Sequence, residues 1–311
     1  MHISALTTCH NRVATTRASL ADLYAQELPE RVTLSVTVVD DGSSDGTSEA
    51  VRREFPHATI VPGDGSLFWA GGMRHGWRQS VSAESFDRLL VFNDDVRLRC
   101  DAVRELLDVD LHARESRGPL TVVTGAFTNE SGSRVTYGGY RRRRGLHPLR
   151  FDEVMPMGKP LTVDTLNMNC ALISRETVNA VGFLADYFHH CGADLEYGLR
   201  VGRAGGSVWL TSRPIGWCQD QPDPLKAAST RFSLTERYRI MTGPKGQSLA
   251  ERARFCREYG GLLWPVWWLG PFVKPLLASA IPEVFESSRG TKAENFRRPQ
   301  HLPDGDVLHR R

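Results

Sequence analysis

The sequence has almost no excess of charge of either sign. Its 311 residues include 39 basic and 36 acidic side chains, which leave a formal net charge of +3. Domains that bind nucleic acid usually carry a strongly basic face, so this balance argues against nucleic acid as the main partner. Hydrophobic residues make up 41% and charged residues 24% of the chain, the ordinary composition of a globular protein. The length allows one large domain, with or without an appendage.

The cysteine spacing and the first residues also lack two common signals. None of the six cysteines lies in a C-x-x-C pair, and their spacing fits neither a zinc site nor a disulfide framework. We therefore expect reduced, mostly buried thiols in a cytoplasmic protein. Residues 1–7 run directly into a strand-like segment and lack the charged region and apolar stretch of a signal peptide, in keeping with that expectation.

Glycine-rich phosphate loops of the two common kinds are absent as well. Neither G-x-G-x-x-G nor G-x-x-x-x-G-K-[ST] follows a predicted strand. Because such loops bind phosphate through backbone N–H groups, their absence leaves a nucleotide phosphate dependent on a metal ion.

The first hundred residues alternate between apolar runs and helical spacing. Apolar, β-branched runs predict strands at 3–8, 34–39, 58–61 and 88–92, and the spacing between them predicts helices at 15–26, 48–55 and 73–80. This order predicts an α/β fold with a doubly wound, mostly parallel sheet flanked by helices.

The rest of the chain has shorter elements. We expect strands at 121–124, 134–140, 161–165, 170–174 and 207–210, and helices at 175–181, 194–204 and across 225–257. Gly182 is the expected C-cap of the first of these helices. Residues 262–285 are very apolar, and the polar residues after them are expected to be disordered near the end.

Polar residues stand at the ends of three predicted strands. Thr7-Thr8, Asp40-Asp41 and Asn93-Asp94-Asp95 occupy these positions. The carboxyl ends of parallel strands meet at one edge of the sheet, where α/β folds bind ligands, so we expect these residues to lie close together. Hard oxygen ligands suit a divalent cation, and Mg²⁺ is typically held by one or two carboxylates together with substrate phosphates. Each group taken alone is also typical of a turn or helix cap.

Residues 63–74 are predicted to be a loop of small residues that opens a helix. Its glycines, among them Gly71, allow the backbone to approach a ligand closely. A helix N-terminus and Arg74 both favour an anionic group. The alternative is an ordinary loop with Trp69 in the core.

A second acidic cluster lies at the predicted start of the helix 194–204. Asp194 occupies the first turn, where the helix dipole favours the ionised carboxylate that a general base needs. Glu196 is two residues further on and cannot share the same helix face. A simple N-cap role for Asp194 remains an alternative at this point.

Taken in order, these segments resemble a family-2 glycosyltransferase of the GT-A fold over about residues 1–220. The resemblance rests on six segments, which are residues 7–12, 38–47, 67–73, 92–95, 169–175 and 192–200. The segment around Trp69 is most similar to bacterial rhamnosyltransferase-like members involved in cell-surface polysaccharide. The implied organisation is a nucleotide-binding half (1–100), an acceptor-binding half (101–220), a helical or interfacial region (221–290) and a disordered tail (291–311).

The resemblance implies roles on the donor side. Asp95 matches the last carboxylate of the family's D-x-D motif, which binds Mg²⁺ or Mn²⁺ across the donor diphosphate, and Asn93 replaces its first carboxylate. Thr8 and Asp40 match nucleoside-binding positions. The rest of the expected donor-binding set is Arg12, Asp41, Trp69, Gly71, Arg74 and Asp94.

The resemblance also implies the catalytic base and the reaction. Asp194 matches the second acid of the family's Glu-Asp pair and would be the base. Ala193 replaces the first acid, which leaves Glu196 as a rival. Residues 217–220 stand where family members often carry a metal-binding histidine. The expected activity is metal-dependent inverting transfer, by a single displacement, of a sugar from a UDP- or dTDP-sugar to a hydroxyl of a cell-surface glycan or lipid-linked saccharide.

Two other functions are considered beside this one. A sugar-phosphate nucleotidyltransferase shares the sheet architecture but usually carries a glycine-rich basic loop after its first strand, where this chain has residues 8–12. A catalytically impaired protein that binds sugar nucleotides or acts as a scaffold is suggested by Asn93 and Ala193.

The apolar segment 262–285 is long enough to cross a bilayer, but four prolines and Lys274 argue against a simple span. Tryptophan-rich apolar sequence with a basic residue is typical of an interfacial segment. We expect peripheral membrane contact at the inner face of the plasma membrane, and the alternative is a helix pair packed on the domain. The run Arg141–Arg144 is either a solvated loop or a contact for an anionic acceptor or lipid headgroups.

Overall fold

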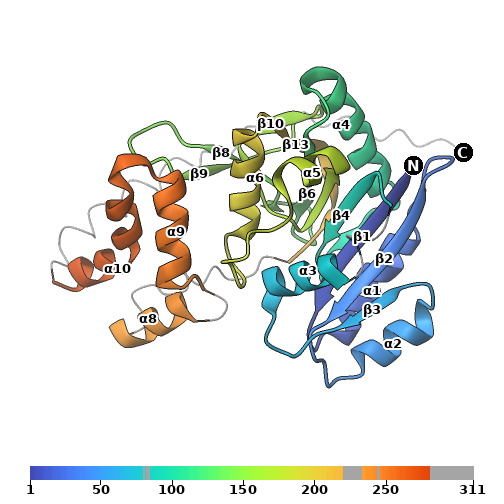
Figure 1. Cartoon of the computed structure of the whole chain (residues 1–311), viewed down its shortest axis with the longest axis horizontal. Helices are drawn as coiled ribbons and strands as arrows, with labels where there is room; N and C mark the ends of the chain where they lie inside the picture. The colour runs from blue at the N-terminus through green and yellow to red at the C-terminus, as the bar shows by residue number, and fades with distance from the viewer. Residues whose placement is uncertain (80, 82–84, 220–232, 244–245, 281–311) are drawn as a thin grey trace, which may run out of the picture. The chain divides into compact units, whose positions relative to one another are not determined.

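The computed structural model describes residues 1–79, 81, 85–219, 233–243 and 246–280 of the chain (Figure 1). The chain forms two compact units, Met1–Trp268 and Leu269–Arg311. The first unit contains the central sheet and the candidate site. Of the second, the structure describes residues 269–280, which belong to the helix α10 (Trp264–Ala280).

A ten-stranded sheet forms the centre of the first unit. Its main path has the order β10-β13-β6-β12-β4-β1-β2-β3, and β5 and β7 pair with β13 and β6 off this path. The bounds are β1 His2–Cys9, β2 Thr33–Asp40, β3 Thr59–Pro62, β4 Arg88–Phe92, β5 Arg97–Leu98, β6 Thr121–Thr128, β7 Val135–Tyr137, β10 Leu161–Val163, β12 Cys170–Ser174 and β13 Ser207–Trp217. A three-stranded sheet has the order β11 (Thr165–Leu166), β8 (Gly139–Arg142) and β9 (Phe151–Val154).

Strand direction brings several carboxyl ends to one edge of the central sheet. β1 is parallel to both β2 and β4, and β2 is parallel to β3, so the strand order turns back between β1 and β4. This is a topological switch point, where open α/β sheets bind ligands. β12 is antiparallel to β4 and to β6, and β13 is parallel to β6. β6 and β13 therefore end at the same edge as β1, β2 and β4.

Helices cover both faces of the sheet (Figure 1). Side chains from α1 and α4 belong to one hydrophobic cluster, and side chains from α3, α5, α6 and α9 belong to the other. The helix bounds are α1 Val13–Tyr24, α2 Thr47–Glu54, α3 Phe68–Gln79, α4 Ala102–Arg117, α5 Arg175–Val181, α6 Ala193–Arg203, α8 Leu234–Thr242, α9 Leu249–Tyr259 and the 3₁₀ turn η2 Gly261–Leu263. The predicted α/β sheet flanked by helices, with apolar helices near the C-terminus, is confirmed.

Several predicted boundaries are correct and others are wrong. Strand 88–92 and helix 175–181 have the predicted bounds, and Gly182 caps that helix with φ +74°. The predicted strand 134–140 is split because Gly138 separates β7, which pairs with the central sheet, from β8 of the small sheet. The strand 161–165 is split in the same way between β10 and β11.

Other elements differ in length or escaped prediction. Strands 121–124 and 207–210 continue to residues 128 and 217, and α4, β5 and β9 were not predicted. The helical stretch 225–257 is interrupted between α8 and α9, where Ser248 forms a new capping box with Glu251. Residues 225–232, 281–285 and 291–311 lie outside the described part.

Helix α3 begins at Phe68, five residues before the predicted start. Asp41 explains this earlier start. One Asp41 carboxylate oxygen accepts the N–H groups of Leu67 and Phe68 at 3.0 and 3.1 Å, which satisfies donors of the first turn. Phe68 adopts φ +54°, a conformation that is unfavourable for a residue with a side chain. The predicted open loop of small residues is therefore shorter than expected, and Gly71 lies inside a helix.

Glycines let α3 lie directly on the sheet. A Cβ atom added to Gly76 would come within 2.5 Å of Val39 Cγ2 and 2.6 Å of Leu6 Cδ1, and one added to Gly72 would collide with the side chain of Thr8. Gly71 faces another way, because its nearest atom would be Leu67 Cβ at 3.5 Å. Close packing of α3 on β1 and β2 therefore explains Gly72 and Gly76.

We predict that Gly76→Ala lowers the free energy of unfolding by about 1–3 kcal/mol through overpacking. Gly71→Ala is the matched control. Its free energy of unfolding should be unchanged or higher by up to about 1 kcal/mol, because alanine has a higher helix propensity than glycine. Urea unfolding of both variants measures the difference. Equal stability of the two variants would contradict this packing.

Candidate active site

The strand-end residues meet at the switch point, as the alternation of elements predicted. Thr8 and Cys9 of β1 lie opposite Val39 and Asp40 of β2. On the other side of β1, Asn93 follows β4, and its N–H donates to the Asn169 carbonyl at 2.9 Å. The ends of β1, β2 and β4 and the start of β12 therefore share one small region.

Two adjacent carboxylates in this region are held by one arginine. Arg12 Nη1 lies 3.2 Å from Asp94 Oδ1 and 2.8 Å from Asp95 Oδ2. Asp94 is only 7% exposed. Burial raises the pKa of Asp94 to about 7, while the Arg12 guanidinium opposes the rise and the Asp95 carboxylate adds to it. Asp94 Oδ2 is buried and has no hydrogen-bond partner within the described residues.

The Asp94-Asp95 pair has the chemistry of a divalent cation site. Both side chains offer hard oxygen ligands, and the unpartnered Asp94 Oδ2 has a free acceptor position. Across the described ranges, no group of three or more His, Cys, Asp or Glu side chains is placed to hold an ion. Asp94 and Asp95 would therefore hold such an ion together with oxygens of a bound ligand.

Cys218 belongs to residues 217–220, which stand where family members often carry a metal-binding histidine, and Asp220 lies outside the described residues. Its Sγ lies 3.7 Å from Asp95 Oδ1. Burial and the Asp95 charge raise the pKa of the Cys218 thiol. A protonated thiol is a poor metal ligand, so this position supplies a weak hydrogen-bond donor to Asp95.

Trp69 reaches the same site from α3. Its indole N–H donates to Asn93 Oδ1 at 2.8 Å, so the ring lies beside the acidic pair and is only partly buried. Asn93 thus joins Trp69 to the end of β4. Trp69 also packs against the hydrophobic cluster, as expected for a loop with this residue in the core.

The N-terminus of α3 and Arg74 contact protein groups. The N–H groups of Ala70 and Gly71 donate to the His189 carbonyl at 3.1 and 3.4 Å. Arg74 Nη1 donates to the carbonyls of Ala185 and Phe188 at 2.8 and 2.7 Å. These bonds hold the loop that leads to α6, and the anion contacts predicted for Gly71 and Arg74 stay predictions.

Asp40 and Asp41 make local hydrogen bonds. Asp40 accepts the Ser43 N–H at 2.9 Å and the Ser48 hydroxyl, as in an Asx turn. Asp41 accepts the Gly65 N–H at 2.8 Å in addition to its bonds at the start of α3. Each carboxylate oxygen has more than one lone pair, so it can accept a further hydrogen bond. The nucleoside contacts expected of Asp40 and Asp41 stay predictions.

Asp194 lies in the first turn of α6 and is held by a short chain of side chains. Asn167 Nδ2 donates to Asp194 Oδ2 at 3.1 Å, and the Tyr140 hydroxyl donates to Asn167 Oδ1 at 2.6 Å. The Leu195 N–H donates to the other Asp194 oxygen at 2.8 Å. Burial raises the pKa of Asp194, although these donors oppose the rise. The expectation that the helix terminus would lower this pKa is therefore wrong, because desolvation outweighs it.

Glu196 points elsewhere. It is 2% exposed, and its two oxygens each accept a hydrogen bond from Arg200 at 2.9 Å. The Tyr259 hydroxyl donates to the same carboxylate at 2.8 Å. Glu196 therefore joins α6 to α9, and the structure separates it from Asp194.

The segment 167–169 connects the acidic pair to Asp194. Asn167 holds Asp194, and Asn169 accepts the backbone N–H of Asn93 and donates from its side chain toward Cys218 Sγ at 3.6 Å. Asn169 stood in the segment that carried the resemblance, whereas nothing in the sequence pointed to Asn167 or Tyr140. Their roles depend on pairing between β8 and β11, which is long-range.

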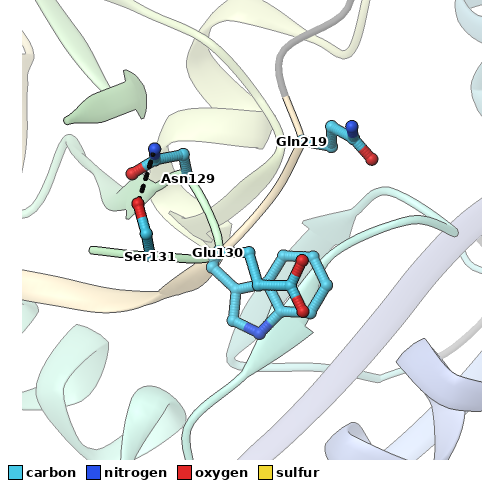
Figure 2. Close-up of a pocket in the computed structure, with 5 residues that line it drawn as sticks. Asn129, Glu130, Ser131 and Gln219 are labelled. Carbon is cyan, nitrogen blue, oxygen red and sulfur yellow. Dashed lines mark hydrogen bonds between the residues drawn. The ribbon is translucent and has the colours of Figure 1, made fainter. Parts of the chain in front are cut away.

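A pocket of about 470 Å³ opens beyond the carboxyl ends of β6 and β13, which lie at the same sheet edge (Figure 2). Its lining consists of Asn129, Glu130, Ser131, Trp217 and Gln219. Trp217 is the last residue of β13 and immediately precedes Cys218, whose thiol contacts Asp95. The Arg97 guanidinium lies 5.8 Å from the Trp217 ring centroid and is fixed by an ion pair with Asp22 at 2.7 Å.

The structure shows a mostly parallel α/β sheet flanked by helices, and sequence comparison gives the family. The profile of glycosyl transferase family 2 matches residues 4–178, so the chain belongs to this family. The predicted family is confirmed.

Curated relatives and solved structures are similar to the chain at low identity. The N-acetylglucosaminyl-diphospho-decaprenol L-rhamnosyltransferases of two Mycobacterium tuberculosis strains are 24% identical over 209 residues, 58% of this chain and 66% of theirs. The chain thus spans slightly less than two thirds of the length of these relatives.

Among solved structures, the mannosyltransferase PcManGT from Pyrobaculum calidifontis, in complex with GDP-Man and Mn²⁺, gives a TM-score of 0.52 at 16% identity, covering 93% of this chain and 79% of that one. S. aureus TarS 1–349 gives 0.50 at 11% identity, covering 95% and 76%. GalNAc-T7 with UDP, GalNAc and Mn²⁺ gives 0.51 at 12% identity, covering 90% and 57%. At these identities the likeness shows the fold alone.

We predict that Asp94→Asn stabilises the metal-free protein more at pH 8 than at pH 5. Asp94 binds its proton more tightly when folded than when unfolded, so wild-type stability falls as pH rises from the ordinary pKa of 3.8 through about 7. Asp94→Asn has no carboxylate to ionise, so its free energy of unfolding at pH 8 should exceed that of the wild type by roughly 1–3 kcal/mol. Urea unfolding with a chelator present measures it. The same gain at both pH values would contradict a raised Asp94 pKa.

Proposed function

We propose that the chain is a metal-dependent inverting glycosyltransferase that moves a sugar from a UDP- or dTDP-sugar to a hydroxyl of a saccharide acceptor. One observation carries this proposal. The Asp94-Asp95 pair and the Asp194 carboxyl approach one sheet edge and are connected through residues 167–169. A site for a diphosphate leaving group and a site for a general base are thereby combined.

On the donor side, Asp94 and Asp95 are the proposed ligands of Mg²⁺ or Mn²⁺, with the donor diphosphate completing the coordination. When bound, the ion neutralises charge that develops on the diphosphate as it leaves. Arg12 keeps both carboxylates together before the donor arrives. The complexes of PcManGT and GalNAc-T7 with nucleotide ligands and Mn²⁺ support this assignment.

The remaining donor contacts are proposed around the same edge. Thr8, Asp40 and Asp41 stand on the nucleoside side, beside the end of β2. Asn93 and Trp69 are joined by their 2.8 Å hydrogen bond and present an indole ring next to the acidic pair. The proposed set also includes Gly71 and Arg74.

Asp194 is the proposed catalytic base. The acceptor oxygen attacks the anomeric carbon, the bond from that carbon to the diphosphate breaks, and the acceptor proton passes to Asp194. One displacement without a covalent enzyme intermediate inverts the anomeric centre. A pKa raised by burial makes the ionised carboxylate a stronger base near neutral pH. Glu196 is already paired with Arg200, which favours Asp194.

We propose the pocket beside Trp217 as the acceptor saccharide position. An indole ring surrounded by amide, hydroxyl and carboxylate groups suits a sugar, which has apolar faces and polar edges. The names of the mycobacterial relatives favour a lipid-linked saccharide.

We further propose that residues 262–285 contact the cytoplasmic face of the membrane. Residues 281–285 of this segment lie outside the described part. No helix in the described ranges is both long and apolar enough to span a bilayer.

We predict that Asp194→Asn lowers kcat for sugar transfer by roughly 10²–10⁴-fold, because the acceptor proton loses its acceptor. Thermal stability should not fall, because burial raises the Asp194 pKa and asparagine has no charge to desolvate. Glu196→Gln is the matched control and should mainly destabilise, by about 3–5 kcal/mol, because it breaks a buried ion pair with Arg200. Release of UDP or dTDP from a donor panel in the presence of bacterial lipid extract gives the rates. Near wild-type transfer by Asp194→Asn would exclude Asp194 as the base.

A further inference from the structure

Two surface features that are far apart in the sequence lie against each other. The ring of His147, in the turn between β8 and β9, stacks on Trp267 at the start of α10, with ring centroids 4.1 Å apart. The β8–β9 hairpin accordingly lies beside the first turns of α10 (Figure 1). The arginine-rich hairpin turn and the first residues of α10 are thus close together.

Large apolar side chains are exposed both on the hairpin turn and near the start of α10. Leu262 is 99% exposed, Leu146 88%, Val266 55% and Leu263 52%. Single exposed apolar residues are common on proteins, but several gathered in one area mark an interaction site. Leu146 belongs to the hairpin turn and the other three to η2 and α10, so both features contribute.

The surface is held rigidly by the domain beneath it. The indole N–H groups of Trp267 and Trp268 donate to the carbonyls of Gly260 and Leu249 at 3.1 and 3.2 Å. Arg252 Nη2 donates to the Trp267 carbonyl at 3.0 Å. These tryptophans therefore fix the start of α10, up to Trp268, on α9, and the exposed residues there are the leucines of η2 and Val266.

The hairpin adds positive charge to this apolar surface. Residues 139–154 contain five arginines and two acidic residues. Arg143 is paired with Asp152. Arg144 and Arg150 are exposed and form no ion pair with any residue in the described part of the chain. Exposed apolar side chains flanked by unpaired arginines are typical of a surface that binds anionic lipid.

We propose that the hairpin turn and the start of α10 form one docking face for an anionic lipid membrane. This face, which we call the basic–apolar face, consists of Arg144, Leu146, Arg150, Leu262 and Val266. It adds the hairpin to the membrane contact given above for 262–285 and assigns the charge of the lipid. The arginines supply attraction to headgroups, and the leucines and Val266 enter the interface.

Hydrogen bonds through α9 connect the basic–apolar face to α6, the helix that carries the proposed base Asp194. Glu251 of α9 accepts hydrogen bonds from His189 in the loop before α6, at 2.6 Å from the ring and 3.0 Å from the backbone. Tyr259, at the end of the same helix, holds Glu196 of α6. Docking of the basic–apolar face would therefore fix α6, which carries Asp194, at a defined position near the lipid surface.

Vesicle co-sedimentation of the full chain tests the proposal, with phosphatidylcholine vesicles that contain or lack phosphatidylglycerol. The wild type should bind vesicles containing phosphatidylglycerol, and Arg144→Glu with Arg150→Glu should weaken that binding by about tenfold or more. Leu262→Asp with Val266→Asp should weaken it comparably. The matched controls are Arg117→Glu and Leu111→Asp on α4, both at exposed positions, and they should bind like the wild type.

Any of three results would overturn the proposal. These are no vesicle binding by the wild type, equal binding by the wild type and the hairpin variant, or a dimer in sedimentation velocity that the Leu262 variant dissociates in the absence of lipid. The last result would assign the face to a second copy of the chain. No donor or acceptor is present, so failure here leaves the transferase proposal standing, and nucleotide binding by every variant checks that its fold is intact.

Discussion

The constraint on which the site depends is the burial of two neighbouring carboxylates. Asp94 is almost fully buried beside Asp95, so its pKa is raised to about 7, and only a positive charge close by keeps that pKa from rising further. Arg12 supplies that charge from the end of β1, so the acidic pair exists only because β1 and β4 are neighbours. The parallel pairing at the switch point therefore determines the chemistry available at this edge.

The rest of the site is arranged around that edge by hydrogen bonds between loops. Asp41 sets the start of α3, and α3 in turn holds the loop before α6 through its N-terminal N–H groups and Arg74. The segment 167–169 ties the end of β4 to Asp194. A change in one of these loops would thus move both the donor side and the base, which makes the two halves of the proposed reaction interdependent.

The sequence predicts the sheet and its polar edge well, because period-two and helical patterns are local and strand ends follow from topology. It places Asp40, Asp94 and Asp95 together for this reason. The sequence does not predict the features that depend on long-range contacts. These are the split of the predicted strand at Gly138, the start of α3 set by Asp41, and the hydrogen bonds that connect Tyr140, Asn167 and Asp194. It also gives the wrong sign for the Asp194 pKa, since burial by distant segments cannot be read from a helix terminus.

The most direct test of the central claim is a thermal-shift titration of UDP and dTDP, each with and without Mn²⁺, on the wild type and Asp95→Asn. We expect one nucleotide to stabilise the wild type only with Mn²⁺, by about 2.7 kcal/mol at a hundredfold excess over Kd. Asp95→Asn should lose this effect, and Asp152→Asn on the hairpin should keep it. Stabilisation that is independent of Mn²⁺, or unchanged in Asp95→Asn, would contradict a metal-bridged donor site at the Asp94-Asp95 pair.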